Sequence, residues 1–136
     1  MVRDIVKDIN FLKKKSLKAT KNDIDIAKDL IDTLKFNNES CVGLAANMIG
    51  FNKNIIAFLS NNEINIMYNP KIIKTRDRYI TKEGCLSLSG KRSTVRHKEI
   101  TVLFLDDNFI KRKATFRDFT AEIIEHEIDH TLGIII

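Results

Sequence analysis

Cysteine is scarce in this chain, with two residues among 136. Two cysteines are too few for the disulfide framework of a small secreted domain, and a reducing compartment would keep both as thiols. The sequence also lacks an apolar run of membrane-spanning length, and its N-terminus carries no signal-peptide pattern. We therefore expect a cytoplasmic protein with no membrane partner.

Internal repeats, linkers and low-complexity segments are missing as well, so the sequence offers no domain boundary. A chain of this length can bury one hydrophobic core. We predict a single domain that spans residues 1–136.

Acidic residues are outnumbered: 23 Lys and Arg stand against 18 Asp and Glu, which leaves a formal net charge of +5. Such an excess permits weak attraction to nucleic acid or ribosomal surfaces. The densest basic clusters, residues 13–15 and 91–98, have no interleaved aromatic residues on which bases could stack. We interpret both clusters as solvated surface and expect no specific nucleic-acid partner.

Two segments are predicted to be helical. Residues 23–36 carry apolar side chains at helical spacing, and Asn22 or Asp23 could cap the N-terminus of that helix. A second helix should begin near Asp118 and continue towards the C-terminus.

Four short runs are predicted to be strands. Residues 54–60 and 64–68 are rich in β-forming residues and are separated by a turn. Residues 100–105 and 109–116 form a predicted hairpin across an acidic turn. Helices combined with hairpin-linked strands predict an α+β fold, a small single domain of short antiparallel strands packed around the C-terminal helix.

The sequence contains three histidines, and two of them, His126 and His130, are four residues apart. On a helix, residues at this spacing lie on one face, where two imidazoles can bind one metal ion. Glu127 lies beside them as a candidate general base. The pattern indicates metal-assisted hydrolysis of an amide; a solvated helix face is the alternative.

A catalytic metal site of this kind needs a third protein ligand and an open position for water. His97 lies in the basic stretch 91–98, a poor place for a cation. Cys85 and Cys41 each lie near a glycine, which permits close approach of the backbone. Spacing alone does not choose between the two thiols, although we favour Cys85 modestly.

Three segments of the chain resemble the motifs of peptide deformylase, which read GxGLAAxQ, EGCLS and HExDH in that order. Here residues 43–46 read GLAA with Gly50 beyond, residues 83–87 read EGCLS, and residues 126–130 read HEIDH. The resemblance covers nearly the whole chain, and Asn69-Pro70 falls where the family has the same pair. It implies the deformylase fold and removal of the formyl group from N-formylmethionyl peptides or nascent chains.

The resemblance also implies a ligand set. Cys85, His126 and His130 match the residues that bind one divalent metal ion in the family. Ferrous iron is the expected native metal, and Zn²⁺, Ni²⁺ or Co²⁺ could occupy the same site.

Roles for other residues follow from the same resemblance. Glu127 is expected to take a proton from water and return it to the leaving amine. The backbone N–H of Leu86 is an expected oxyanion donor, and the backbone of Gly43 is expected to meet the peptide. The expected substrate contacts are Val42, Gly43, Met48, Glu83 and Ile123.

Met48 departs from the family pattern, which has glutamine at this position as a second oxyanion donor. A thioether has no hydrogen to donate, and the side chain of the adjacent Asn47 is expected to point elsewhere. Loss of one oxyanion donor typically slows catalysis by about 10²–10³-fold. We therefore expect slow deformylation. The alternative is a deformylase-like metal-binding protein without that activity, which binds a formylated ligand or acts on another small amide.

Several positions keep open interpretations. Asp129 could orient the metal ligands or pair with a nearby base, and Cys41 could be a small buried apolar residue or a reactive thiol. His97 is most simply a surface histidine. The chain ends at Ile136, without the C-terminal extension that in bacterial deformylases often forms a helix used to contact the ribosome, so the sequence does not favour ribosome contact.

Overall fold

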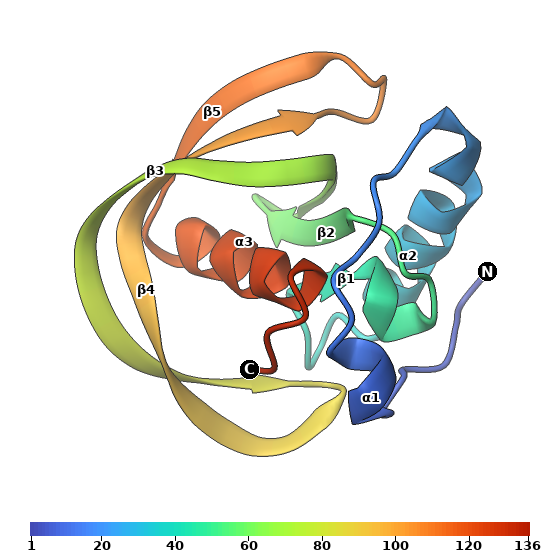
Figure 1. Ribbon diagram of the computed structural model, residues 1–136, viewed down its shortest axis with the longest axis horizontal. Helices are drawn as coiled ribbons and strands as arrows, with labels where there is room; N and C mark the ends of the chain where they lie inside the picture. The colour runs from blue at the N-terminus through green and yellow to red at the C-terminus, as the bar shows by residue number, and fades with distance from the viewer.

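A five-stranded antiparallel sheet, in the order β1-β2-β3-β4-β5, forms the frame of the computed structural model, which describes residues 1–136. Two of its strands are long and bend around the C-terminal helix (Figure 1). The strands are β1 (Gly43–Ala45), β2 (Ile55–Ser60), β3 (Glu63–Cys85), β4 (Leu88–Leu105) and β5 (Lys111–Arg117). The α+β architecture predicted from the sequence is confirmed.

The helices lie inside and beside this curved sheet. In Figure 1, α3 (Asp118–Thr131) is surrounded by β3 and β4, whereas α1 (Ile9–Leu12) and α2 (Ile24–Phe36) lie on the opposite side. Two short 3₁₀ turns complete the fold, η1 (Lys21–Asp23) and η2 (Ala46–Ile49). None of the helices has the length and apolar character needed to span a bilayer.

Both predicted helices are present, and each begins within one residue of the expected position. The apolar stripe of α2 buries Ala27, Leu30 and Leu34 against the sheet. The predicted cap is different, because the Asp23 carboxylate accepts from the backbone N–H of Thr20 and closes the capping box of η1 instead.

The predicted strands are also present, but β3 and β4 extend far beyond the apolar runs that indicated them. Their paired register continues from Tyr68↔Leu105 to Cys85↔Leu88, with register shifts near Lys71, Lys74 and Gly84. Irregular pairing of this kind bends a ribbon and increases its twist. The bend allows the far end of the hairpin to return to α3, where Cys85 meets the histidines.

The core is one cluster of 23 buried apolar residues to which α2, β2, β4 and α3 all contribute. Ile124 of α3 has no exposed surface and lies within this cluster. The polar face of α3 is turned towards the β3–β4 hairpin, as the contacts of Glu122 with Tyr79 and of Glu125 with His97 show. That face carries the histidines.

Candidate metal centre

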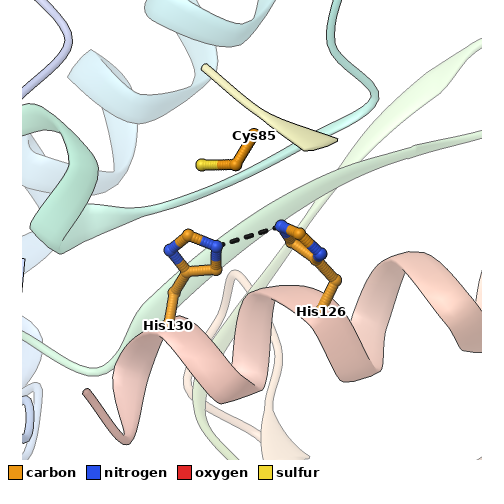
Figure 2. Close-up of side chains that lie close together, drawn as sticks. All are labelled: Cys85, His126 and His130. Atoms are coloured by element: carbon orange, nitrogen blue, oxygen red, sulfur yellow. Dashed lines mark hydrogen bonds between the residues drawn. The ribbon is translucent and has the colours of Figure 1, made fainter. Parts of the chain in front are cut away.

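The face of α3 that meets the β3–β4 hairpin carries His126 and His130, one helical turn apart (Figure 2). Their Nε2 atoms lie 3.0 Å apart. Cys85 ends β3, and its thiol lies with the two imidazoles so that the three potential ligand atoms are within 4.8 Å of one another. Both histidines are buried and Cys85 is half-buried. Three side chains from two distant segments therefore converge on one point.

The orientation of His126 is fixed by a buried carboxylate. Its Nδ1–H donates to Glu83 Oε1 at 2.7 Å, which leaves Nε2 directed at His130. A carboxylate in this position sets the tautomer of a metal-binding imidazole and increases its basicity. Glu83 was expected to contact substrate; its carboxylate is engaged by His126.

Glu83 is held in turn by Arg96 of β4, which is 2% exposed. The guanidinium donates to Glu83 Oε1 at 2.8 Å and to Asp129 Oδ2 at 2.7 Å. One arginine therefore links β3, β4 and α3 beneath the site. The interpretation of residues 91–98 as solvated surface is wrong for Arg96, because the alternation of β4 turns this side chain inward.

The charges of this cluster follow from burial and hydrogen bonding. Burial opposes ionisation of Glu83, but the hydrogen bonds from His126 and Arg96 outweigh it and hold its pKa at about 2. Burial also disfavours the His126 cation, yet hydrogen bonds to Cys85 and Glu83 raise the pKa of His126 to about 10 when no metal is present. Burial and the neighbouring His126 charge lower the pKa of His130 to about 3. His130 is thus a neutral imidazole, the form that binds a metal.

Glu127 has a different environment although it follows His126 directly. It is 4% exposed, and its Oε1 atom has no hydrogen-bond partner. Burial therefore raises the pKa of Glu127 to about 7. A carboxyl group with this pKa can exchange a proton at neutral pH, as a general base requires.

Gly43 of β1 lies against Glu127 and has no space for a side chain. An added Cβ would lie 2.8 Å from Ile123 Cγ2 and 2.9 Å from Glu127 Oε2. A glycine at this position therefore permits β1 to approach α3 closely. The carboxyl group is confined between the strand and its own helix.

A cavity of about 610 Å³ opens in front of this cluster. Its wall contains Cys85, His126 and Glu127 together with Leu86, which follows Cys85 in the turn between β3 and β4. All five residues expected to contact substrate also line it: Val42, Gly43, Met48, Glu83 and Ile123. Phe119, 61% exposed, extends the apolar wall to the rim.

Met48 is 1% exposed and presents a thioether to the cavity. The neighbouring Asn47 does not replace the missing donor, because its Nδ2 donates to the backbone oxygen of His130 at 2.9 Å. That hydrogen bond connects η2 to the end of α3. Asn47 therefore helps to position α3 and does not line the cavity.

Three further positions left open by the sequence have definite contacts. Asp129 pairs with Arg96, which favours the ion-pair interpretation over orientation of the ligands. His97 is half-buried, and its Nδ1 lies 3.2 Å from Glu125 Oε2. Cys41 lines the cavity, and its S–H donates to the oxygen of Gly43. Burial raises the pKa of the Cys41 thiol to about 12, so it is not a reactive thiolate.

The donor set fits a divalent metal ion of borderline softness. One thiolate and two imidazoles suit zinc or ferrous iron, and three protein ligands leave a coordination position facing the cavity. The Nε2 atoms already face each other across the required space. A curved antiparallel sheet that encloses such a helix, with a buried carboxylate beside the ligands, defines a metal-dependent hydrolase.

Comparison with known proteins identifies the particular family. Residues 2–136 match the family described as Polypeptide deformylase, and the chain belongs to it. It is 56% identical over 136 residues to the peptide deformylase of Clostridium beijerinckii, with both chains covered in full. It is 33% identical to the enzyme of Pseudothermotoga lettingae over 129 residues, 91% of this chain and 74% of the relative.

A solved structure has the same fold. The actinonin-bound class I type b peptide deformylase from Acinetobacter baumannii aligns with a TM-score of 0.87 and 28% identity, covering 99% of this chain and 95% of that one. Deformylases are metal-dependent, and the cluster of Cys85, His126 and His130 is the possible metal site of this member.

Proposed function

We propose that this protein is a metal-dependent hydrolase that removes the formyl group from N-formylmethionyl peptides or nascent chains. The observation that carries the proposal is Glu127, a buried carboxyl group with a pKa near neutrality, beside the Cys/His/His cluster at an open cavity. A protein that only bound a metal would not need this base. The family to which the chain belongs supplies the reaction class.

Cys85, His126 and His130 would hold one divalent ion, with Fe²⁺ as the proposed native metal and Zn²⁺, Ni²⁺ or Co²⁺ as substitutes. Such an ion lowers the pKa of a water molecule towards about 7 and polarises a carbonyl oxygen. Glu83 and Arg96 keep His126 in the tautomer that binds the ion.

The remaining steps are assigned to side chains and backbone around the cavity. Glu127 accepts a proton from the attacking water and returns it to the departing amine. The backbone N–H of Leu86 donates to the developing oxyanion, and the backbone of Gly43 pairs with the peptide. Val42 and Ile123 provide an apolar wall for the methionine side chain.

Met48 makes the proposed reaction slow. The cavity wall offers a thioether where a second oxyanion donor would be useful, and Asn47 is engaged by His130. The second candidate function, binding of a formylated ligand or hydrolysis of another small amide, is favoured by this one position. The retained Glu127 favours deformylation.

The decisive experiment measures deformylation of a formyl-Met peptide by anaerobically iron-loaded protein, beside Met48→Gln and Glu127→Gln. We expect measurable turnover in the native chain and an increase of about 10²–10³-fold in Met48→Gln. Glu127→Gln should keep its metal and lose at least about 10²-fold in kcat.

Two other outcomes separate the candidates. Turnover confined to Met48→Gln would favour the binding or alternative-amide function for the native chain. If neither the native chain nor Met48→Gln is active with iron bound, the deformylase proposal is refuted.

We also propose the cytoplasm as the compartment in which the protein acts. Cys41 and Cys85 are both free, and Cys85 must stay reduced to bind a metal. Contact with the ribosome stays a prediction.

A further inference from the structure

A second cavity lies behind the turn that carries the metal-binding cysteine. It has a volume of about 430 Å³ and is lined by residues from the N-terminal segment and from both sides of the β3–β4 turn. Figure 1 shows this end of the hairpin lying beside α1. The lining residues are Lys7, Ile9, Leu86, Ser87, Leu88, Ser89 and Arg92. Leu86 also lines the metal cavity, so the two cavities share one wall.

Two buried polar atoms of this wall have no partner. Ser87 is 3% exposed, and its Oγ atom forms no hydrogen bond. The Nη1 atom of Arg92 is likewise buried and unpaired, although Nη2 of the same side chain donates to the oxygen of Ser89 at 3.2 Å. A buried hydroxyl or guanidinium nitrogen without a partner is uncommon and destabilising in a folded protein. Each group has a hydrogen to donate, and both residues line the same cavity.

The charge of the cavity points to the kind of acceptor. Lys7 and Arg92 both line it, neither forms an ion pair within the chain, and no carboxylate is among the lining residues. Ile9, Leu86 and Leu88 add apolar surface to the wall beside these polar groups. Two cations and a hydroxyl donor against an apolar wall suit an oxyanion.

We propose that Lys7, Ser87 and Arg92 form a binding site for a small oxyanion behind the metal-binding turn. Phosphate and carboxylate share the required chemistry, so the occupant is either a free anion or the carboxylate of a bound peptide that extends past Leu86. An anion bound here would fix the two-residue turn Leu86–Ser87, whose first residue borders the metal cavity. Binding of a free anion is independent of the proposed function, whereas binding of a peptide carboxylate rests on it.

The first test uses inorganic phosphate and the zinc-loaded protein, with thermal unfolding followed at constant ionic strength. Phosphate should raise Tm in the native chain, because a ligand that binds only the folded state stabilises it. Arg92→Gln and Lys7→Gln should each weaken the apparent affinity by about tenfold, the usual effect of removing one charge-assisted hydrogen bond.

Arg78→Gln is the matched control, since Arg78 is an exposed arginine of the same hairpin that lines neither cavity. It should keep the full phosphate effect. Lys7 is exposed, so Lys7→Gln tests the site even if Arg92→Gln fails to fold. A phosphate effect equal in all four proteins would mean binding elsewhere, for instance at the metal, and would count against the free anion.

The second test compares KM for formyl-Met-Ala-Ser with KM for the same peptide amidated at its C-terminus. If the peptide carboxylate is the occupant, Arg92→Gln should raise KM about tenfold for the acid and leave the amide unchanged. If Arg92→Gln leaves both KM values unchanged but loses the effect of phosphate on Tm, the occupant is a free anion. The proposal is overturned if Arg92→Gln and Lys7→Gln alter neither phosphate binding nor the acid-to-amide ratio. Absent turnover with phosphate binding intact would refute the deformylase proposal alone.

Discussion

Two glutamates at this centre are both buried, yet their protonation differs at neutral pH. Glu83 accepts from His126 and Arg96, and its pKa stays near 2. Glu127 has an unpaired oxygen, and burial raises its pKa to about 7. Hydrogen-bond donors outweigh burial at Glu83, whereas burial dominates at Glu127. One carboxylate is thereby suited to hold a ligand and the other to exchange a proton.

This difference predicts a pH-dependent stability effect in the metal-free protein. The ordinary pKa of 4.5 applies to Glu127 in the unfolded chain, and about 7 applies in the folded one. Between these values the folded state holds the extra proton, so the contribution of Glu127 to stability falls as pH rises from 4.5 to 7. The glutamine in Glu127→Gln does not titrate. The free energy of unfolding of this variant, relative to that of the native chain, should therefore increase across this window, towards a difference of about 3 kcal/mol above pH 7.

Urea unfolding of chelator-treated native protein and Glu127→Gln at pH 4.5, 6 and 8 measures the effect. Glu39→Gln is the matched control, because Glu39 is exposed. An offset between the native chain and Glu127→Gln that stays constant from pH 4.5 to 8 would contradict the assignment of the raised pKa to Glu127.

Arg96 predicts a second effect at the scale of one residue. Arg96→Met removes the guanidinium that pairs with Glu83 and Asp129 and leaves both carboxylates near the core. Loss of one partner of a buried ion pair typically destabilises a protein by about 3–5 kcal/mol. Arg117→Met is the control, since Arg117 pairs with Glu99 at the surface, where such pairs contribute about 0–1 kcal/mol. Equal losses in the two variants, measured by urea unfolding, would show that Arg96 does not stabilise the site.

At the scale of elements, the sequence predicted the helices and the metal face of α3 because both depend on local spacing. The separation of His126 and His130 is fixed by one helical turn. The full length of β3 and β4 was not predicted, since residues 71–99 are mostly polar and show no clear alternation of apolar and polar side chains. Only long-range pairing, such as Glu83↔Arg92 and Arg78↔His97, defines this ribbon.

The burial of Arg96 and the position of Cys85 depend on the same ribbon. The register that places Glu83 near Arg96 is set by the two-residue turn after Cys85. Choice of Cys85 over Cys41 as the candidate ligand therefore came from the family motif and not from spacing. The bends that bring Cys85 to α3 are register shifts, which leave no pattern in hydrophobicity.

The end of α3 provides a test of element packing. Gly133 follows the helix with φ of +78°, and an added Cβ would lie 2.2 Å from the backbone oxygen of Lys13. Gly133→Ala must move either α3 or the N-terminal segment, so it should destabilise by more than the roughly 1 kcal/mol that a left-handed conformation alone costs. Gly90→Ala is the matched control, with φ of +76° and nothing within 4 Å of the added atom. Equal effects on Tm would show that the contact with Lys13 is unimportant.

For the whole molecule, the candidate metal site joins segments that are far apart in sequence. Cys85 lies at the tip of a long hairpin, whereas His126 and His130 belong to the buried helix. The hairpin also meets the helix through the Glu83–Arg96–Asp129 contacts and through His97 and Glu125. A bound ion adds a cross-link between sheet and helix that the unfolded chain does not possess.

Metal removal should therefore lower the stability of the entire domain. At a free metal concentration about a thousandfold above Kd, the bound ion contributes roughly 4 kcal/mol. For a domain of this size such a loss should lower Tm by about 10 °C or more. Cys85→Ser should abolish the difference between loaded and chelator-treated protein, whereas Cys41→Ser should retain it, because Cys41 lies outside the ligand cluster. Calorimetry with parallel metal analysis measures both quantities. Full metal content and an unchanged Tm difference in Cys85→Ser would exclude this thiol as a ligand and would leave the hairpin attached to α3 through side-chain contacts such as Glu83–Arg96–Asp129 and His97–Glu125.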